Sequence, residues 1–191
     1  MSRVIPVYEP TPMGIIAQVH IDVWKAITQA ADEYGCKTFI ELGIYRGGTG
    51  IFYLEKCKRE PDFLYVGVDL HPEWMDPQFA KAYPPIKNAK ILLGSVFEER
   101  IKQAVAGILQ ERGRTLVFSD HGGEILAQGL RVYAPMLKAG DYLVVHDYPD
   151  EIGDSDIEYV LGQGYELVEP ERWLKQLYTP LFRRVRADAA D

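Results

Sequence analysis

A strand, a glycine-rich turn and a helix follow one another early in the chain, and they constrain the fold more than any other feature. The apolar run from Thr38 to Leu42 predicts a buried strand that stops at Gly43. The turn 43–50 contains four glycines and leads into a helical pattern at 51–56. Glycines permit positive φ and close backbone approach, and the free N–H groups at a helix start can bind an anion.

The next apolar run, 63–70, carries Asp69 near its end, and this acid completes the pattern. In units of this kind, an acid at the tip of the second strand binds the two hydroxyls of a ribose. Together the turn and Asp69 predict a binding site for a nucleoside-type cofactor. The alternative is a plain connection between a strand and a helix, because a glycine pattern alone is a weak signal.

Length and composition indicate one globular domain, with 191 residues that are 47% apolar and 26% charged. The formal net charge of −7 disfavours a nucleic-acid partner, and the single basic cluster, 183–186, predicts a solvated strand face and tail. Cys36 and Cys57 lack metal-ligand spacing and are expected to be buried and reduced. The chain shows neither a secretory signal nor a membrane span, so a cytoplasmic protein without a membrane partner is expected, and a homo-oligomer stays open.

Predicted helices and strands alternate through the rest of the chain. A helix is expected over 15–34 and ends at Gly35. Further strands are expected at 90–94, 115–119 and 142–145, helices at 97–112, 124–137 and 155–161, one short helix within 71–85, and a late hairpin from 165–169 and part of 177–185. This order predicts an α/β fold, a single Rossmann-like domain with a doubly wound, mostly parallel sheet. We expect the domain to cover 35–186, with an N-terminal arm and cap helix at 1–34 and a tail at 187–191.

Acids and histidines follow the predicted fourth and fifth strands, where open α/β sheets bind their ligands. Asp120 and His121 come directly after 115–119, and His146 and Asp147 come after 142–145. If these strands are neighbours, about 4.8 Å apart, the two aspartates can bind one ion, and carboxylates suit Mg²⁺ or Mn²⁺. His146 would be a third ligand or a general base. The competing interpretation is that both aspartates only cap loops or helix starts.

The turn from Glu41 to Thr49 resembles the first motif of class I S-adenosylmethionine-dependent methyltransferases. The resemblance implies that the acid and glycines of the turn surround the methionine half of the cofactor, and that the Thr49 hydroxyl contacts its carboxylate. Asp69 matches the ribose acid of the family, and 94–96 resembles the turn beside the adenine. The implied cofactor-binding residues are Glu41, Gly43, Tyr45, Gly47, Thr49, Asp69, Ser95, Asp120 and His121.

A closer resemblance, over about residues 35–150, is to the divalent-metal-dependent O-methyltransferases. These include the catechol type and the group around cephalosporin-hydroxylase-like, macrolide and rhamnosyl O-methyltransferases. In them an aspartate after the fourth strand and an acidic pair after the fifth bind Mg²⁺, which implies Asp120, His146 and Asp147 as metal ligands here. The sequence departs from the family in three places. Gly122-Gly123 stand where the catechol type has a lysine base, Tyr148 where it has an amide ligand, and His146 where the second group has an acid.

These patterns predict an S-adenosylmethionine-dependent methyltransferase that acts on a hydroxyl of a small hydroxylated metabolite, with Mg²⁺ or Mn²⁺ at the strand tips. His146, His121 and Asp120 are the candidate catalytic residues. One alternative is a non-catalytic module that binds S-adenosylmethionine. A second is an NAD(P)-dependent oxidoreductase, although the glycine spacing from 43 to 50 differs from Gly-x-Gly-x-x-Gly.

Overall fold

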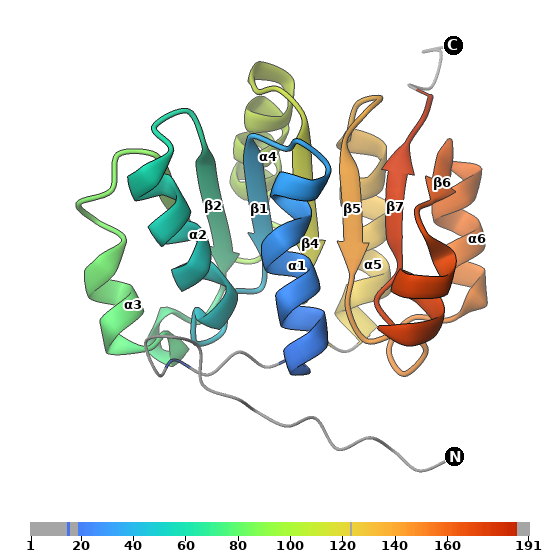
Figure 1. The fold of residues 1–191 in the computed structure, drawn as a ribbon, viewed down its shortest axis with the longest axis horizontal. Coiled ribbons are helices and arrows are strands. Elements are labelled where there is room, and N and C mark those ends of the chain that lie inside the picture. Colours follow the sequence, from blue (N-terminus) through green and yellow to red (C-terminus); the bar gives the residue numbers. More distant parts are fainter. Residues whose placement is uncertain (1–14, 16–18, 123, 187–191) are drawn as a thin grey trace.

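A seven-stranded sheet with helices on both faces confirms the predicted Rossmann-like α/β fold (Figure 1). The computed structural model describes residues 15, 19–122 and 124–186. The strand order is β3-β2-β1-β4-β5-β7-β6, in which β1 to β5 are parallel and β7 is antiparallel to both neighbours. The strands are β1 Thr38–Leu42, β2 Leu64–Asp69, β3 Ala89–Leu93, β4 Thr115–Ser119, β5 Tyr142–Val145, β6 Tyr165–Leu167 and β7 Leu181–Arg184.

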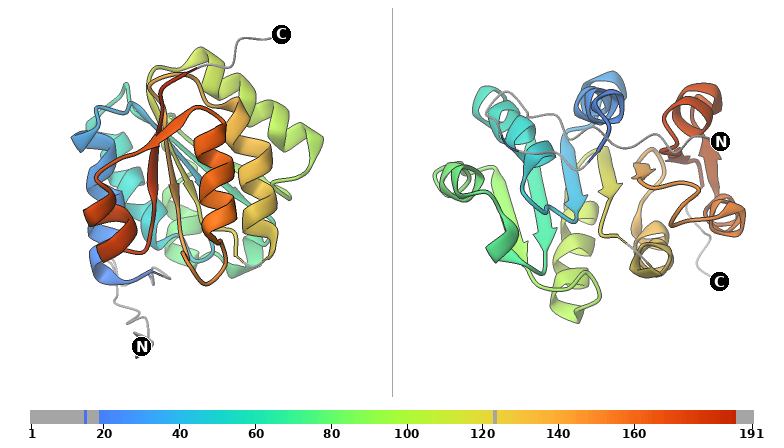
Figure 2. Two further views of the ribbon diagram at one scale, coloured as in Figure 1. Left: turned by 90° about the vertical axis from the view of Figure 1, so that its right-hand side faces the viewer. Right: turned by 90° about the horizontal axis from the view of Figure 1, so that it is seen from below.

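The helices form two layers, which Figure 2 shows in the view from below. One layer contains α1 Ile21–Glu33, α2 Gly48–Arg59 and α3 Pro77–Ala82; the other contains α4 Glu99–Glu111, α5 Glu124–Tyr133 and α6 Asp154–Gly162. Short helical segments complete the chain at η1 Pro72–Trp74, η2 Ala134–Met136 and η3 Glu171–Gln176. Every residue of β1, β2, β4 and β5 is buried, as expected for strands covered on both faces.

The helix predicted over 15–34 is shorter than expected, because it begins at Ile21. The backbone of His20 is extended, and its imidazole accepts a hydrogen bond from the Asp22 amide, which caps the helix. The Trp24 indole donates to Gly48 O over 3.2 Å, so α1 packs against the start of α2. The predicted arm at 1–14 and tail at 187–191 lie outside the described residues.

Four further details differ from the sequence prediction. The connection 71–85 contains two short helical segments instead of one, and the segment η3 had not been predicted. Arg184 was expected in a solvated strand face, but β7 lies between β5 and β6 and this side chain is only 1% exposed. Its guanidinium lies 5.0 Å from the centre of the Tyr165 ring. The helix expected over 124–137 ends earlier, at Tyr133, and Pro135 lies in the short segment η2 that follows. Both cysteines are free and buried, as expected.

Within the described ranges, no helix combines the length and apolar character that a membrane span requires.

Candidate active site

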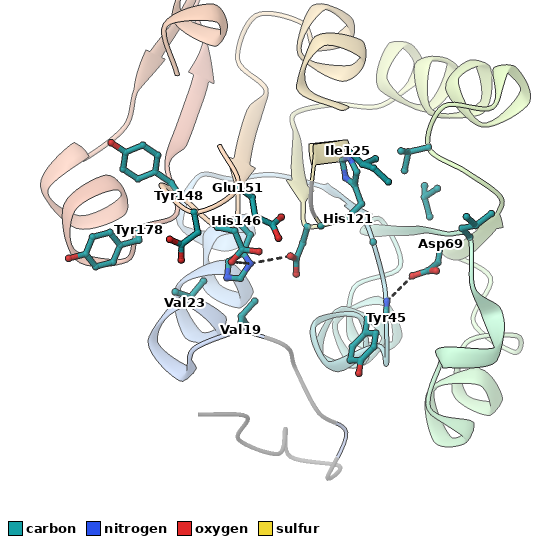
Figure 3. Close-up of a pocket in the computed structure, with 18 of the residues that line it drawn as sticks. Val19, Val23, Tyr45, Asp69, His121, Ile125, His146, Tyr148, Glu151 and Tyr178 are labelled. Atoms are coloured by element: carbon teal, nitrogen blue, oxygen red, sulfur yellow. Dashed lines mark hydrogen bonds and ion pairs between the residues drawn. The ribbon is translucent and has the colours of Figure 1, made fainter. Parts of the chain in front are cut away.

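A cavity of about 1050 Å³ opens at the carboxyl ends of the parallel strands (Figure 3). The loops after β1, β2, β3, β4 and β5 all contribute to its wall, as do the start of α1 and the segment before β7. From β1 the chain proceeds outward through β2 and β3, whereas β4 and β5 lie on the other side. The cavity therefore occupies the topological switch point, where doubly wound sheets bind ligands.

Asp69 joins the tip of β2 to the glycine turn. One carboxylate oxygen, Oδ2, accepts hydrogen bonds from the backbone amides of Ile44 and Tyr45, both at 2.8 Å, and Oδ1 accepts from the His71 amide at 2.7 Å. Although Asp69 is only 9% exposed, it lines the cavity. Because each carboxylate oxygen has two lone pairs, Oδ1 can still accept one hydrogen bond from a ligand.

The residues predicted to bind the cofactor divide into two groups. Those that line the cavity are Gly43, Tyr45, Asp69, Ser95, Asp120 and His121. The other three, Glu41, Gly47 and Thr49, are buried and are not among the lining residues. Glu41 accepts a hydrogen bond from the Tyr65 hydroxyl, and burial raises the pKa of this carboxyl well above its ordinary value.

Asp120, His146 and Asp147 come together where β4 and β5 end side by side. Nδ1 of His146 lies 3.1 Å from Oδ1 of Asp120 and 2.9 Å from Oδ1 of Asp147. One ligand atom from each of the three lies within 4.8 Å of the other two. Asp147 has a φ of 59°, a left-handed conformation that is uncommon for a residue other than glycine. We call these three residues the strand-tip cluster.

The strand-tip cluster favours a positive charge at its centre. Burial on its own lowers the pKa of His146, but the carboxylates of Asp120 and Asp147 outweigh burial and raise this pKa to about 10. Burial raises the pKa of Asp120, and the neighbouring His146 counteracts this rise. Two carboxylates and one imidazole also form a donor set that suits a divalent ion, and the nitrogen favours Mn²⁺ or another transition ion over Mg²⁺.

His121 lines the cavity but directs its ring nitrogens elsewhere. Its Nδ1 lies 3.3 Å from Oγ of Ser119, and its buried Nε2 has no hydrogen-bond partner among the described residues. The ring packs against α5 at Gly129, where a Cβ would lie 2.5 Å from Cε1 of His121. The ring of Phe97 meets it edge-on with 6.4 Å between the ring centres. Asp120 is therefore better placed than His121 to receive a proton from an acceptor, whereas the raised pKa of His146 keeps that imidazole protonated near neutral pH.

Several residues that line the cavity were not among the predicted site residues. Tyr148 had been noted only as a departure from the catechol type, and it lines the cavity directly after the strand-tip cluster. Tyr178 gave no signal in the sequence, because its segment reaches the site only through the insertion of β7 beside β5. The Tyr148 amide donates to Tyr178 O over 3.3 Å, which joins the two segments. The cavity is also lined by four of the large apolar side chains that are exposed, namely Leu70, Trp74, Ile125 and Tyr178.

A sequence model of the rhamnosyl O-methyltransferase/CmcI family matches residues 13–168. The chain belongs to this family. No curated protein matches the sequence. The family match confirms the predicted S-adenosylmethionine-dependent O-methyltransferase and its resemblance to the metal-dependent group.

Solved structures of related fold agree with this family. The apo structure of CmcI-N160 is 17% identical in sequence and has a TM-score of 0.71, and the alignment covers 94% of this chain and 78% of that chain. The structure described as cmcI-D160 Mg-SAM is 18% identical with a TM-score of 0.66, covering 91% and 75%. CalS11, a TDP-rhamnose 3'-O-methyltransferase of calicheamicin biosynthesis, is 14% identical with a TM-score of 0.60, covering 85% and 78%. At these identities the likeness supports the fold, and the family match supports the activity.

Proposed function

We propose that this enzyme binds S-adenosylmethionine with the ribose on Asp69, and transfers the methyl group to a sugar hydroxyl held at the strand-tip cluster. The observation that supports this proposal most strongly is that the glycine turn, Asp69 and the strand-tip cluster all line one cavity. The family description names rhamnosyl O-methyltransferases, and CalS11, which has a similar fold, is described as a TDP-rhamnose 3'-O-methyltransferase. These descriptions favour a sugar as the acceptor.

The cofactor end of the cavity contains Gly43, Tyr45, Asp69 and Ser95. Asp69 would accept a hydrogen bond from a ribose hydroxyl with the remaining lone pair of Oδ1, while the bonds of Oδ2 to Ile44 and Tyr45 keep the carboxylate in place. Gly43 and Tyr45 would border the methionine half. The exposed side chain of Leu70, next to Asp69, offers an apolar surface for the adenine.

Asp120, His146 and Asp147 are the residues that would hold a divalent ion. Such an ion lowers the pKa of a hydroxyl that it binds and stabilises the negative charge on the oxygen during methyl transfer. The protein's own contribution is to hold the acceptor oxygen in line with the methyl group and to exclude water from the cavity. If the reaction needs no ion, Asp120 is the candidate base that would receive the proton of the acceptor hydroxyl.

Asp69→Ala should weaken the binding of S-adenosylhomocysteine, the demethylated product, by about 1–3 kcal/mol, because the ribose hydroxyls lose a charged partner. Isothermal titration calorimetry of the folded variant measures this change. Asp69→Asn keeps the side-chain volume and one acceptor oxygen, so this variant should lose less affinity for S-adenosylhomocysteine than Asp69→Ala.

Asp76→Ala provides a matched control for Asp69→Ala. Asp76 caps α3 by accepting from the Gln78 amide, and it does not line the cavity. Its loss should lower stability but leave product affinity unchanged. A folded Asp69→Ala protein with normal affinity would contradict the proposed ribose contact.

The release of S-adenosylhomocysteine in the presence of rhamnosides and other hydroxylated acceptors tests the activity itself. Binding of the cofactor without turnover over a broad panel would contradict the proposal and favour a non-catalytic binding module.

A further inference from the structure

The cavity has two ends, separated by the strand-tip cluster. Figure 3 shows Tyr45 and Asp69 on one side of His146, and Tyr148 and Tyr178 on the other. The second end is formed by the start of α1, the loop 148–151 and the segment 176–178. Because the cofactor would occupy the glycine-turn end, we call the second one the acceptor end.

The acceptor end is acidic. Asp22, Asp150 and Glu151 line it, next to Asp147 of the strand-tip cluster. Among the described residues that line the whole cavity, there is no lysine or arginine. A divalent ion in the strand-tip cluster would balance the charges of Asp120 and Asp147 and add no surplus. The acceptor end would therefore stay negative with the ion bound.

Helix starts are the other common binding sites for phosphate, and the two nearest ones are occupied by the chain itself. At α1, the His20 imidazole accepts from the Asp22 amide, and the Asp22 carboxylate lies in the first turn. At α6, which follows the loop 148–151, Asp154 and Asp156 lie in the first turn. The Gly153 amide donates to Oδ2 of Asp156 at 3.2 Å. Neither helix start therefore offers a free positive end to an anion.

Aromatic rings complete the acceptor end. Tyr178 is 56% exposed and has a φ of 52°, and its carbonyl oxygen accepts from the Tyr148 amide, so its backbone is tied to the loop 148–151. The Tyr148 hydroxyl donates to Oδ1 of Asp154 at 2.8 Å, which fixes that ring as well. Rings of this kind offer apolar surface to the C–H face of a sugar, and carboxylates accept hydrogen bonds from its hydroxyls.

We propose that the acceptor end selects a sugar without phosphate groups, a glycoside, and excludes nucleotide-activated sugars. This inference rests on the proposed O-methyltransferase function and narrows its substrate class. A nucleoside diphosphate would bring two or more negative charges against Asp22 and Asp150, which lie outside the strand-tip cluster, with no lysine or arginine among the described lining residues to balance them. The substrate is then the product of a glycosyl transfer, and methylation follows the attachment of the sugar.

Two measurements test this proposal on the full chain. Methyl transfer to p-nitrophenyl α-rhamnoside should exceed transfer to TDP-rhamnose by about tenfold or more in kcat/KM, because like charges repel the nucleotide sugar. In calorimetry, TDP should show no binding at about millimolar concentration, with or without S-adenosylhomocysteine and with or without Mg²⁺. Preference for TDP-rhamnose, or binding of TDP to the unaltered protein at about micromolar concentration, would overturn the proposal.

Charge variants identify the residues responsible. Asp22→Lys and Asp150→Lys should each introduce measurable TDP binding that weakens as the salt concentration rises, while the affinity for S-adenosylhomocysteine stays unchanged. Asp62→Lys makes the same change in net charge at an exposed position just before β2, at the amino ends of the parallel strands and so away from the cavity, and should leave TDP binding absent. Equal TDP binding by all three variants would show that the charges of the acceptor end are not responsible, and would contradict the proposal.

These outcomes also separate this inference from the proposed function. If the unaltered protein does not bind S-adenosylhomocysteine, the proposed function is contradicted. The TDP titrations test the exclusion of nucleotide sugars separately, because they require no turnover.

Discussion

Gly43→Ala should lower the free energy of unfolding by about 3–5 kcal/mol and abolish methyl transfer. Gly43 has a φ of 98°, and a Cβ at this position would lie 2.8 Å from the Asp120 carbonyl carbon and 2.9 Å from the His121 Cα. The backbone cannot easily move away, because the Gly43 amide donates to Val68 O and the Asp120 amide donates to Leu42 O. Any relaxation would displace Asp120, which belongs to the strand-tip cluster.

Two other glycines separate the causes of this effect. Gly140 has a φ of 93° but only an ordinary contact near its Cβ position, so Gly140→Ala measures backbone strain without the clash. Gly113 has no atom within 4 Å of that position, so its alanine variant should be almost neutral. Chemical denaturation compares the three variants. A Gly43→Ala protein that is no less stable than Gly140→Ala would contradict the close approach of the two strand tips.

The glycines also show what the sequence could not reveal. Their pattern predicted the turn and the helix after it, and both are present. The pattern could not identify the neighbour that requires the missing side chain. At Gly43 this neighbour is the backbone of Asp120 and His121, and at Gly47 it is the Phe79 ring, 2.7 Å from the Cβ position at Cδ2. Both neighbours come from elements distant in sequence.

The parallel strands and the site residues that follow them could be predicted, because both are indicated by short stretches of the sequence. Continuous apolar runs gave β1, β2, β4 and β5, and the residues directly after β4 and β5 formed the strand-tip cluster as expected. The predicted start of α1 was wrong because Ile15 and Val19 continue the helical spacing of apolar residues. Both side chains are buried, at 0% and 3% exposure, but neither residue belongs to a helix. Burial of Arg184 and the position of Tyr178 depend on β7 lying next to β5, which no local pattern specifies.

Chelation of divalent ions should reduce methyl transfer by about 100-fold or more, and Mn²⁺ should restore it at lower concentration than Mg²⁺. The reason is the donor set of Asp120, His146 and Asp147, which contains one imidazole nitrogen. Initial rates over a range of each ion, after treatment with EDTA, measure this preference. S-adenosylhomocysteine affinity provides the control, since Asp69 and the glycine turn do not belong to the strand-tip cluster.

His146→Asp tests the part of this prediction that concerns the metal preference. Three carboxylates present only oxygen ligands, so the variant should shift the preference from Mn²⁺ towards Mg²⁺. Without any ion it should be less stable than the unaltered protein, because His146 now lies 3.1 Å and 2.9 Å from two carboxylate oxygens that would instead face a third acid. His146→Ala removes the nitrogen without adding charge, and should lower turnover while leaving cofactor affinity intact. Activity that is unaffected by the chelator, with no ion bound by Asp120 and Asp147, would rule out the metal and leave Asp120 to accept the proton of the hydroxyl.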